Sequence, residues 1–471
     1  MKSFLKFLIP MIIIAWIGTS LVMCRTKEGP PPVDKTERNV VIYNMDDDED
    51  TFKKVLRGYL DKHPYVDVTY KKFDDFADYE KLILDELAEG EGPDIFAMPN
   101  SWFVKNKGKV SPMPDSMGSP DDFRSIYVGV VANDLLTQNT DGIEKVYGVP
   151  MFVDSLALYY NQDHFEDRLP GKGKPSGTWD GIKGNVISLM KTAEGEVEVA
   201  GVAMGTVGNV SYPADILYNL MIQHGVVFYD DIMKEALFSE SNDYAAVDAM
   251  NLYVSFADPS QRHFSWDEDL ALDYFAGDVT AFLKGEVSMI FGYSSMYDYI
   301  MSQRKIASSK GLSVIDADVV KTAPMPQLLD PTDSTEKRDV YGRYYAFGVS
   351  RNSEHSDVAW DILTYLGSPE AMNVYFEETN RPTSRRDMLA KQRLHPIFGV
   401  FVDQAGFAES FAVVDYLKFD EMIAQAISYV LEGATPRDAL KNVQEKVQVE
   451  IPKNGYVTPL DEEYYEETLG E

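Results

Sequence analysis

An acidic run, Asp46-Asp47-Asp48-Glu49-Asp50, directly follows an apolar segment that predicts a strand. The run lacks the central glycine of a calcium-binding loop. Acidic side chains here favour the start of a helix through the helix dipole. Ligands also bind beyond the carboxyl ends of strands in open α/β sheets, so Asp46 or Asp47 can reach a ligand hydroxyl there. From the residues alone, a helix start and a ligand contact both stay open.

A further carboxylate, Asp154, interrupts the apolar segment Tyr147–Asn161. A charge among apolar side chains costs free energy unless it has a partner. We therefore predict that Asp154 contacts a ligand, and structural capping of the chain is the alternative.

The chain carries no common enzyme signature, because G-x-S-x-G, H-E-x-x-H and G-x-x-x-x-G-K-[ST] are all absent. Gly171–Lys174 resembles part of a phosphate loop, but Pro175 follows where Ser or Thr is required. Metal-ligand spacing is also absent among the six histidines, His63, His164, His224, His263, His355 and His395. The sequence therefore predicts no catalytic residues, no metal site and no cofactor.

Composition bounds the possible partners. The chain has 471 residues, of which 45% are hydrophobic, enough for two sizeable cores. Its formal net charge of −32 repels nucleic-acid phosphates and anionic lipid headgroups, so neither is an expected electrostatic partner. The single cysteine, Cys24, excludes a disulfide within the chain and a thiolate metal cluster.

The N-terminus has the layout of a targeting segment, in which two lysines precede the apolar run Phe7–Met23 and Cys24 follows it. This layout resembles a bacterial lipoprotein signal, which implies that Cys24 becomes the lipid-carrying first residue. Met23 stands where such signals carry a small residue. The run is also long enough to cross a bilayer, so an uncleaved anchor is the alternative. Residues 25–38 are polar and proline-rich and predict a tether.

Five segments beyond the tether are predicted to be strand, helix, strand, helix and strand. They span residues 40–43, 52–60, 67–70, 76–87 and 94–98. Apolar residues recur at helical spacing in the second and fourth, and the others are short apolar or alternating runs. This order predicts a parallel, doubly wound α/β unit. Further helices are predicted at 244–256, 358–366 and 419–431.

Five longer segments carry a resemblance to a known family. They read GEGPDIFAMPNSW (90–102), YGVPMFVDSLALYYN (147–161), AGVAMGTVGN (200–209), KGEVSMIFGY (284–293) and NRPTSR (380–385). In this order and spacing they resemble the extracellular solute-binding proteins of ABC importers, a family that includes maltose-binding and other sugar-binding members. The resemblance extends from Asn39 to Ile451.

The resemblance implies a two-lobed, periplasmic-binding-protein-like α/β fold, in which each lobe is a doubly wound sheet with helices and crossover strands form the hinge. Crossovers are expected near 150–153, 289–291 and 344–347. The expected parts are a signal segment (1–24), the tether (25–38), lobe 1 (39–152 with 290–344), lobe 2 (153–289 with 345–451) and a C-terminal tail (452–471).

A sugar-binding cleft needs aromatic platforms for the C–H faces of the sugar and polar groups for its hydroxyls. Ligand contacts are predicted from Asp46, Asp47, Asn100, Ser101, Trp102, Asp154, Gly205, Thr206, Asn209, Trp266, Tyr293, Tyr344, Tyr345 and Arg381. Trp102 is the predicted stacking platform and Asp154 the acceptor across the hinge. Structural alternatives are a surface-covering Trp102, a simple turn at Gly205, and a buried ion pair for Arg381.

The resemblance implies an extracytoplasmic, membrane-anchored, monomeric binding protein, not an enzyme, that captures a sugar or oligosaccharide and delivers it to an ABC permease. The first alternative keeps this importer role with a polyamine, an organic anion or a metal chelate as cargo. Two other classes stay open, a surface-anchored glycoside hydrolase and a structural lipoprotein without a ligand.

Overall fold

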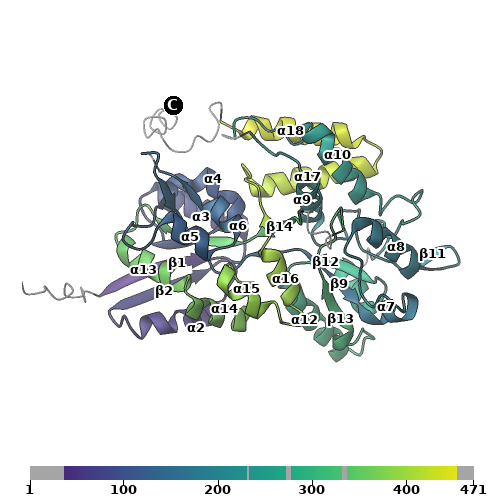
Figure 1. Cartoon of the computed structure of the whole chain (residues 1–471), viewed down its shortest axis with the longest axis horizontal. Coiled ribbons are helices and arrows are strands. Elements are labelled where there is room, and N and C mark those ends of the chain that lie inside the picture. Colours follow the sequence, from purple (N-terminus) through teal and green to yellow (C-terminus); the bar gives the residue numbers. More distant parts are fainter. Residues whose placement is uncertain (1–36, 140, 231–232, 272–276, 331–336, 453–471) are drawn as a thin grey trace, which may run out of the picture.

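The computed structural model describes residues 37–139, 141–230, 233–271, 277–330 and 337–452. These residues form two lobes with the strand β14 (Val340–Arg343) between them (Figure 1). Cys24, the predicted signal segment and all but the last two residues of the tether lie outside the described residues, as does the tail from residue 453 onward. Within the described ranges, no helix combines the length and apolarity needed to cross a membrane.

Lobe 1 is built on a mixed sheet of strand order β2-β1-β3-β15-β4, and β7 also pairs with β15. β1 lies parallel to β2 and β3, whereas β15 runs antiparallel to β3, β4 and β7. The strands of this lobe, including the separate β5–β6 pair, are β1 (Arg38–Asn44), β2 (Val66–Lys72), β3 (Ile95–Pro99), β4 (Val110–Ser111), β5 (Leu136–Gln138), β6 (Glu144–Val146), β7 (Val149–Pro150) and β15 (Tyr345–Ser350).

Helices α2 (Glu49–Leu60) and α13 (Ser356–Leu366) of lobe 1 pack against this sheet. The first of them buries Phe52, Val55 and Tyr59, which recur at helical spacing. Its start is capped by Asp48, whose carboxylate accepts a hydrogen bond from the Thr51 amide at 2.8 Å, so part of the acidic run is a helix start. The helices are α2 (Glu49–Leu60), α3 (Phe76–Ala88), η1 (Asn100–Trp102), α4 (Phe103–Asn106), η2 (Lys107–Lys109), α5 (Pro120–Ile126), α6 (Gly129–Leu135), α13 (Ser356–Leu366), α14 (Pro369–Thr379) and α15 (Arg386–Gln392).

Lobe 2 contains the antiparallel sheet β12-β9-β13. Its strands and the β10–β11 pair are β9 (Ala157–Asn161), β10 (Lys191–Ala193), β11 (Glu196–Val199), β12 (Met289–Gly292) and β13 (Val320–Ala323). The helices are α7 (Gln162–Arg168), α8 (Trp179–Leu189), α9 (Pro213–Gln223), α10 (Ser241–Val254), α11 (Gly277–Lys284), α12 (Met296–Ser309), η3 (Ala317–Val319), α17 (Tyr416–Leu431) and α18 (Pro436–Glu450). Helices α10, α17 and α18 pack together at one end of this lobe (Figure 1).

A separate three-stranded sheet of order β16-β14-β8 joins the lobes. β8 (Asp154–Ser155) lies in the chain between β7 of lobe 1 and β9 of lobe 2, and β14 leads into β15 of lobe 1. Arg343 pairs with Asp154 in this sheet. β16 (Ala408–Glu409), which follows α16 (Gly399–Ala405), then leads to α17 of lobe 2. The crossovers expected near 150–153 and 344–347 agree with these connections.

Two of the expected lobe boundaries are wrong. Residues 290–344 were expected in lobe 1, but β12 and β13 both pair with β9, so no crossover occurs at 289–291. Residues 345–451 were expected in lobe 2, but β15 pairs with β3 and both α13 and α14 pack against α2 of lobe 1, so of this segment only α17 and α18 pack against helices of lobe 2 as expected. An apolar run predicts a strand without specifying which sheet supplies its hydrogen-bonding partner, and here the pairing across the sheet decides.

The two-lobed α/β fold itself is confirmed, as are the first five predicted elements, which correspond to β1, α2, β2, α3 and β3. The helices predicted at 244–256, 358–366 and 419–431 correspond to α10, α13 and α17 and begin or end a few residues away. In lobe 2 the named strands pair antiparallel rather than parallel.

Candidate functional site

A partly buried ion pair stands at the hinge between the lobes. Arg343 ends β14, and its Nη1 lies 3.3 Å from Oδ2 of Asp215, in the first turn of α9. The Tyr293 hydroxyl donates a hydrogen bond to the same oxygen at 3.0 Å. The guanidinium carbon lies 4.8 Å from the centre of the Tyr416 ring, within cation–π range. The pair therefore presents a cation, an anion and two aromatic rings in one place.

A pocket of about 380 Å³ opens beside this pair. The residues that line it come from the start of α9, the end of β14 and one face of α17: Ser211, Tyr212, Pro213, Ala214, Asp215, Arg343, Asp420, Glu421 and Ala424. The neighbouring Tyr416 of α17 also contacts Phe76 of α3, with ring centroids 6.3 Å apart. Because α9 and α17 belong to lobe 2 and β14 lies between the lobes, the pocket lies on the lobe-2 side of the hinge, and its volume suits a small solute.

The two acids nearest this pocket influence each other. Oδ1 of Asp420 accepts a hydrogen bond from the Tyr218 hydroxyl at 2.7 Å. Burial raises the pKa of Asp215, and Arg343 opposes that rise. Burial and the nearby Asp215 carboxylate raise the pKa of Asp420 as well. The pocket wall thus holds two carboxylates in an environment where their negative charge is only partly compensated.

A second ion pair lies on the lobe-1 side of the hinge. Arg381 Nη1 donates to Oδ2 of Asp46 at 2.8 Å, and its guanidinium carbon lies 4.5 Å from the centre of the Phe152 ring. Asp47 is buried beside this pair and accepts a hydrogen bond from the Tyr375 hydroxyl at 3.2 Å. Burial raises the pKa of Asp47 to about 6, while Arg381 opposes the rise. The predicted alternative of a buried ion pair for Arg381 matches this geometry.

Tyr345 connects the two ion pairs. It begins β15, and both Arg343 and Arg381 lower its pKa, whereas burial and Asp46 raise it, with a net rise to about 12. Arg343 and Arg381 are therefore close enough to act on one side chain. Of the predicted site residues, the structure gathers Asp46, Asp47, Asp154, Tyr293, Tyr345 and Arg381 around the hinge.

Comparison with known protein families identifies the chain. The family model of bacterial extracellular solute-binding proteins matches residues 44–373, more than half of the sequence. The protein belongs to this family. Asp46, Asp215 and Arg343 lie within the matched range, and Arg381 and Asp420 follow it. The family is one of substrate-binding transport proteins that act outside the cell membrane.

Curated relatives of this solute-binding protein are distant. A protein of Brucella abortus, named only as a binding protein, is 20% identical over 413 residues, which cover 85% of this chain and 90% of the relative. A maltooligosaccharide ABC transporter solute-binding lipoprotein of Streptococcus pneumoniae is 28% identical over 152 residues, which cover 31% of this chain and 33% of the relative. Both relatives belong to the same broad class of binding proteins.

Solved structures share the fold. The sugar-binding protein MalE of Xanthomonas citri superposes with a TM-score of 0.70 at 16% identity, covering 88% of this chain and 97% of that one. The cyclic α-maltosyl-1,6-maltose binding protein of Arthrobacter globiformis gives 0.68 at 18% identity, covering 89% of this chain and 100% of that one. These likenesses establish the two-lobed architecture of the binding protein.

Asp154 has internal partners at the hinge. Its Oδ2 accepts hydrogen bonds from the Ser294 amide at 3.0 Å and from the Ser294 hydroxyl at 2.6 Å, and its Oδ1 accepts from the Ser155 amide at 2.9 Å. Burial raises its pKa to about 6, although these hydrogen bonds oppose the rise. The carboxylate ties β8 to the end of β12, so the structure favours capping, and ligand contact stays a prediction.

Four predicted residues lie in the lobe-1 interior. Asn100 exchanges hydrogen bonds with the backbone of Tyr344, whose hydroxyl donates to Asp134 at 2.8 Å. The Ser101 carbonyl accepts from the Val413 amide at 3.3 Å. Trp102 is 2% exposed and its Nε1 donates to Glu80 at 2.6 Å. A ring buried in this way has no open face for a sugar in this conformation, and the stacking role of Trp102 stays a prediction.

Another four, Gly205, Thr206, Asn209 and Trp266, lie within lobe 2. Thr206 donates to the Asn209 side chain, and the Asn209 amide donates to the carbonyls of Asp267 and Leu270 at 2.8 and 2.6 Å. The indole of Trp266 is 1% exposed. This arrangement matches the alternative of a hydrogen-bonded turn, which Gly205 enters with a φ of +108°.

Gly205→Ala is expected to destabilise the protein by about 2–4 kcal/mol, because a left-handed L-residue is strained and the new Cβ overpacks the site. That Cβ would stand 2.8 Å from both the amide nitrogen and the Cβ of Ala257. Gly208→Ala is the control in the same loop, since its Cβ would meet no atom within 4 Å. Urea unfolding of both variants is the measurement, and equal midpoints would contradict the expectation.

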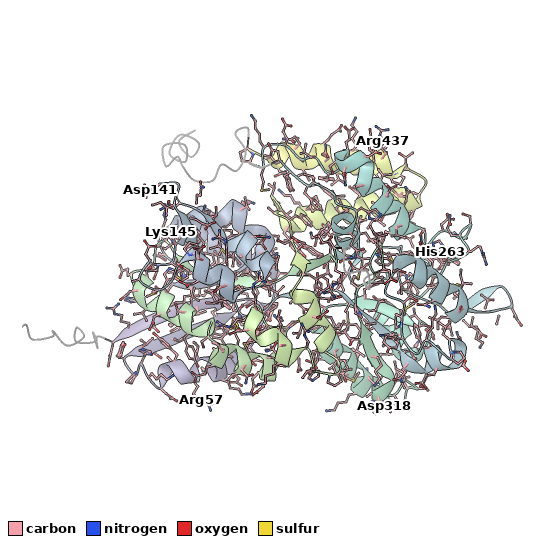
Figure 2. All side chains as sticks on the ribbon, viewed as in Figure 1. Arg57, Asp141, Lys145, His263, Asp318 and Arg437 are labelled. Carbon is pink, nitrogen blue, oxygen red and sulfur yellow. The ribbon has the colours of Figure 1, made fainter. Side chains whose placement is uncertain are left out.

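The histidines do not converge. His263, for example, lies in lobe 2 (Figure 2), where its Nε2 is 2.9 Å from the Ser255 hydroxyl. Among the residues with described positions, no group of three His, Cys, Asp or Glu side chains is arranged to hold a metal ion. The groups that the hinge residues offer to a ligand are therefore hydrogen-bonding groups, charged side chains and aromatic rings.

Sequence reasoning missed the central members of the site. Arg343 stands directly before the tyrosine pair in an otherwise apolar strand, and Asp215 stands in the almost entirely buried α9. A charge inside an apolar element was the signal used for Asp154, and it would also have selected these two residues. Tyr416 and Asp420 carry no comparable local signal, because α17 has an ordinary amphipathic pattern.

Proposed function

We propose that this solute-binding protein captures a sugar or oligosaccharide in the pocket beside Arg343 and Asp215 and delivers it to an ABC permease. The observation that carries the proposal is the pocket on the lobe-2 side of the hinge, where a partly buried Arg–Asp pair meets aromatic rings. Relatives named for maltooligosaccharide and structures named for sugars support the same ligand class.

The chemistry of the pocket suits a sugar. Tyr212 lines it and packs edge-on against Tyr293, with ring centroids 5.1 Å apart, so one ring can lie against the C–H face of a pyranose. Carboxylates of Asp215 and Asp420 can accept hydrogen bonds from hydroxyls, and Arg343 can donate to hydroxyl oxygens. Such directional contacts around an aromatic face are what a polyol requires.

The test is a thermal-shift screen of the mature chain against sugars, polyols, polyamines, organic anions and metal chelates. A bound sugar at 100 times its dissociation constant should stabilise the folded state by about 2.7 kcal/mol. Tyr212→Ala should weaken binding about tenfold or more, whereas Tyr429→Ala, which changes an exposed tyrosine of α17, should leave affinity unchanged. If only compounds of another class stabilise the protein, the proposed cargo is that class and not a sugar. Chromatography of the sugar recovered after binding should show that it has not been hydrolysed.

We further propose that the chain is anchored outside the cell membrane through Cys24. The apolar segment that ends before Cys24 supports this proposal, together with the lipoprotein named among the relatives. In cells given a fatty-acid analogue, the wild-type chain should carry the label and Cys24→Ser should lose it. A wild-type chain that stays unlabelled but sediments with membranes would favour the uncleaved anchor.

A further inference from the structure

The charges that line the pocket are unequal. Asp215, Asp420 and the exposed Glu421 contribute carboxylates, and Arg343 contributes the single guanidinium among the lining residues. The N-terminus of α9 adds a partial positive charge, but Asp215 stands in that same first turn and offsets it. An anionic ligand would therefore meet more negative than positive charge in this pocket.

One of these carboxylates has an unused oxygen. Asp215 is 3% exposed, and its Oδ2 receives both the Arg343 guanidinium and the Tyr293 hydroxyl. Its Oδ1 is buried and accepts no hydrogen bond from any residue that the structure describes. A buried acceptor without a donor costs free energy, so this oxygen favours a ligand that brings a donor.

Among the residues that the structure describes, the other groups around the acid pair do not supply the missing positive charge. The titratable and charged groups that act on the pair from α9, β14, β12–α12 and α17 are Tyr212, Tyr218, Tyr341, Arg343, Tyr293, Tyr416 and Glu421. Further out, Asp278 binds the amide and hydroxyl of Ser211, and Asp154 acts on Tyr212. Arg381 is already paired with Asp46. The tyrosines stay neutral, so negative charge prevails.

We propose that the sugar recognised by this pocket carries a protonated amine, which binds between the carboxylates of Asp215 and Asp420. This inference rests on the proposed sugar-binding function and names the class of sugar, an aminated saccharide. A sugar hydroxyl can donate a hydrogen bond to Oδ1 of Asp215. It adds no positive charge, however, so the negative charges of Asp215 and Asp420 still exceed the single positive charge of Arg343 when the lobes close over the ligand. An ammonium group satisfies the same oxygen and balances the charge.

The number of protons released on binding distinguishes an ammonium-bearing ligand from a neutral one. In the empty protein the pKa values of Asp215 and Asp420 are raised, chiefly by burial, so at mildly acid pH the pair holds part of a proton. A bound ammonium favours the ionised carboxylates and lowers these pKa values, which releases the proton. A neutral sugar adds no charge: its removal of water raises the pKa values while its hydroxyl hydrogen bonds lower them, so it should release fewer protons than the ammonium.

The experiment is calorimetric titration with matched pairs of ligands, glucosamine with glucose and the β-1,4 glucosamine tetramer with cellotetraose. At about pH 5.5, where a sugar amine is fully protonated, titrations in two buffers of different ionisation enthalpy count the protons exchanged. We expect the aminated member of a pair to bind about tenfold or more tightly than the neutral one and to release protons. Asp420→Asn should remove most of that preference and the proton release, whereas Glu432→Gln, which changes an exposed acid at the end of α17 outside the pocket lining, should keep both.

Other results of these titrations would contradict either the aminated ligand or the sugar class. Equal or tighter binding of the neutral member, or proton uptake with the amine, would overturn the aminated ligand and leave sugar binding in place. Binding of spermidine without any sugar of either pair would overturn the sugar class and keep a cationic cargo. Absence of binding by all five probes would contradict the inference, and the wider sugar panel would then decide the proposed function separately.

Discussion

Arg343→Ala is expected to lower the free energy of unfolding of the ligand-free protein by about 3 kcal/mol. The change leaves Asp215, 5% exposed in its side chain, as a buried carboxylate without its cation. The Arg343 side chain is 30% exposed, so the expected loss in stability lies at the low end of the range for breaking a buried ion pair. Ligand binding should fall as well, since the same guanidinium lines the pocket.

Arg338→Ala is the matched control for this variant. Arg338 and Asp403 form an ion pair of the same 3.3 Å length, but their side chains are 44% and 41% exposed. Arg338 also lies over an aromatic ring, that of Phe407 at 4.1 Å. A solvent-exposed pair contributes about 0–1 kcal/mol, so the control should lose little stability. Urea unfolding of both variants measures the loss in the free energy of unfolding for each ion pair. Equal losses would show that the buried pair at the hinge stabilises the protein no more than the exposed pair does.

Trp102→Ala is expected to destabilise the ligand-free protein by about 3–5 kcal/mol, the usual result of truncating a core tryptophan. The side chain is almost fully buried, and its ring packs edge-on against Phe76 at 6.2 Å between centroids. The change also removes the donor to Glu80. Trp102→Phe keeps much of the ring volume and should lose clearly less stability.

Thermal unfolding together with ligand titration separates the two roles of Trp102. A core residue lowers the melting temperature of the empty protein, and the affinity of the remaining folded protein changes little. A stacking platform, which the sequence predicts, would instead lower affinity about tenfold or more while the empty protein melts almost as before. The second pattern would mean that the ring becomes exposed to the cleft in another conformation of the lobes.

Local sequence patterns were sufficient for the first five elements of lobe 1, β1, α2, β2, α3 and β3. Phe52, Val55 and Tyr59 lie at a spacing that only a helix brings to one face, and Asp48 caps that helix with its own side chain. The strands on either side are short apolar or alternating runs bounded by turns. Information of this kind lies within a few residues of chain, so it can be interpreted without knowing what packs nearby.

Sheet membership could not be determined in the same way. The runs that form β12 and β15 predict strands equally well in either lobe, because a strand's own residues do not name its neighbour. The pairing partners lie far away in sequence, as β12 joins β9 and β15 joins β3. The exchange of these two segments between the lobes, relative to expectation, is a consequence of that missing long-range information.

The residues of the candidate site also fall into two groups, those that local sequence patterns indicated and those that only long-range contacts reveal. The sequence by itself, through its resemblance to a known family, implied a two-lobed binding fold, and its polar and charged residues selected Asp46, Asp154, Tyr345 and Arg381. Only the tertiary structure decided that Asp215 faces Arg343, 128 residues away, and that Asp420 hydrogen-bonds to Tyr218, 202 residues away. A charge gains its function from the partner and the burial that folding gives it, and neither is encoded in the neighbouring residues of the chain.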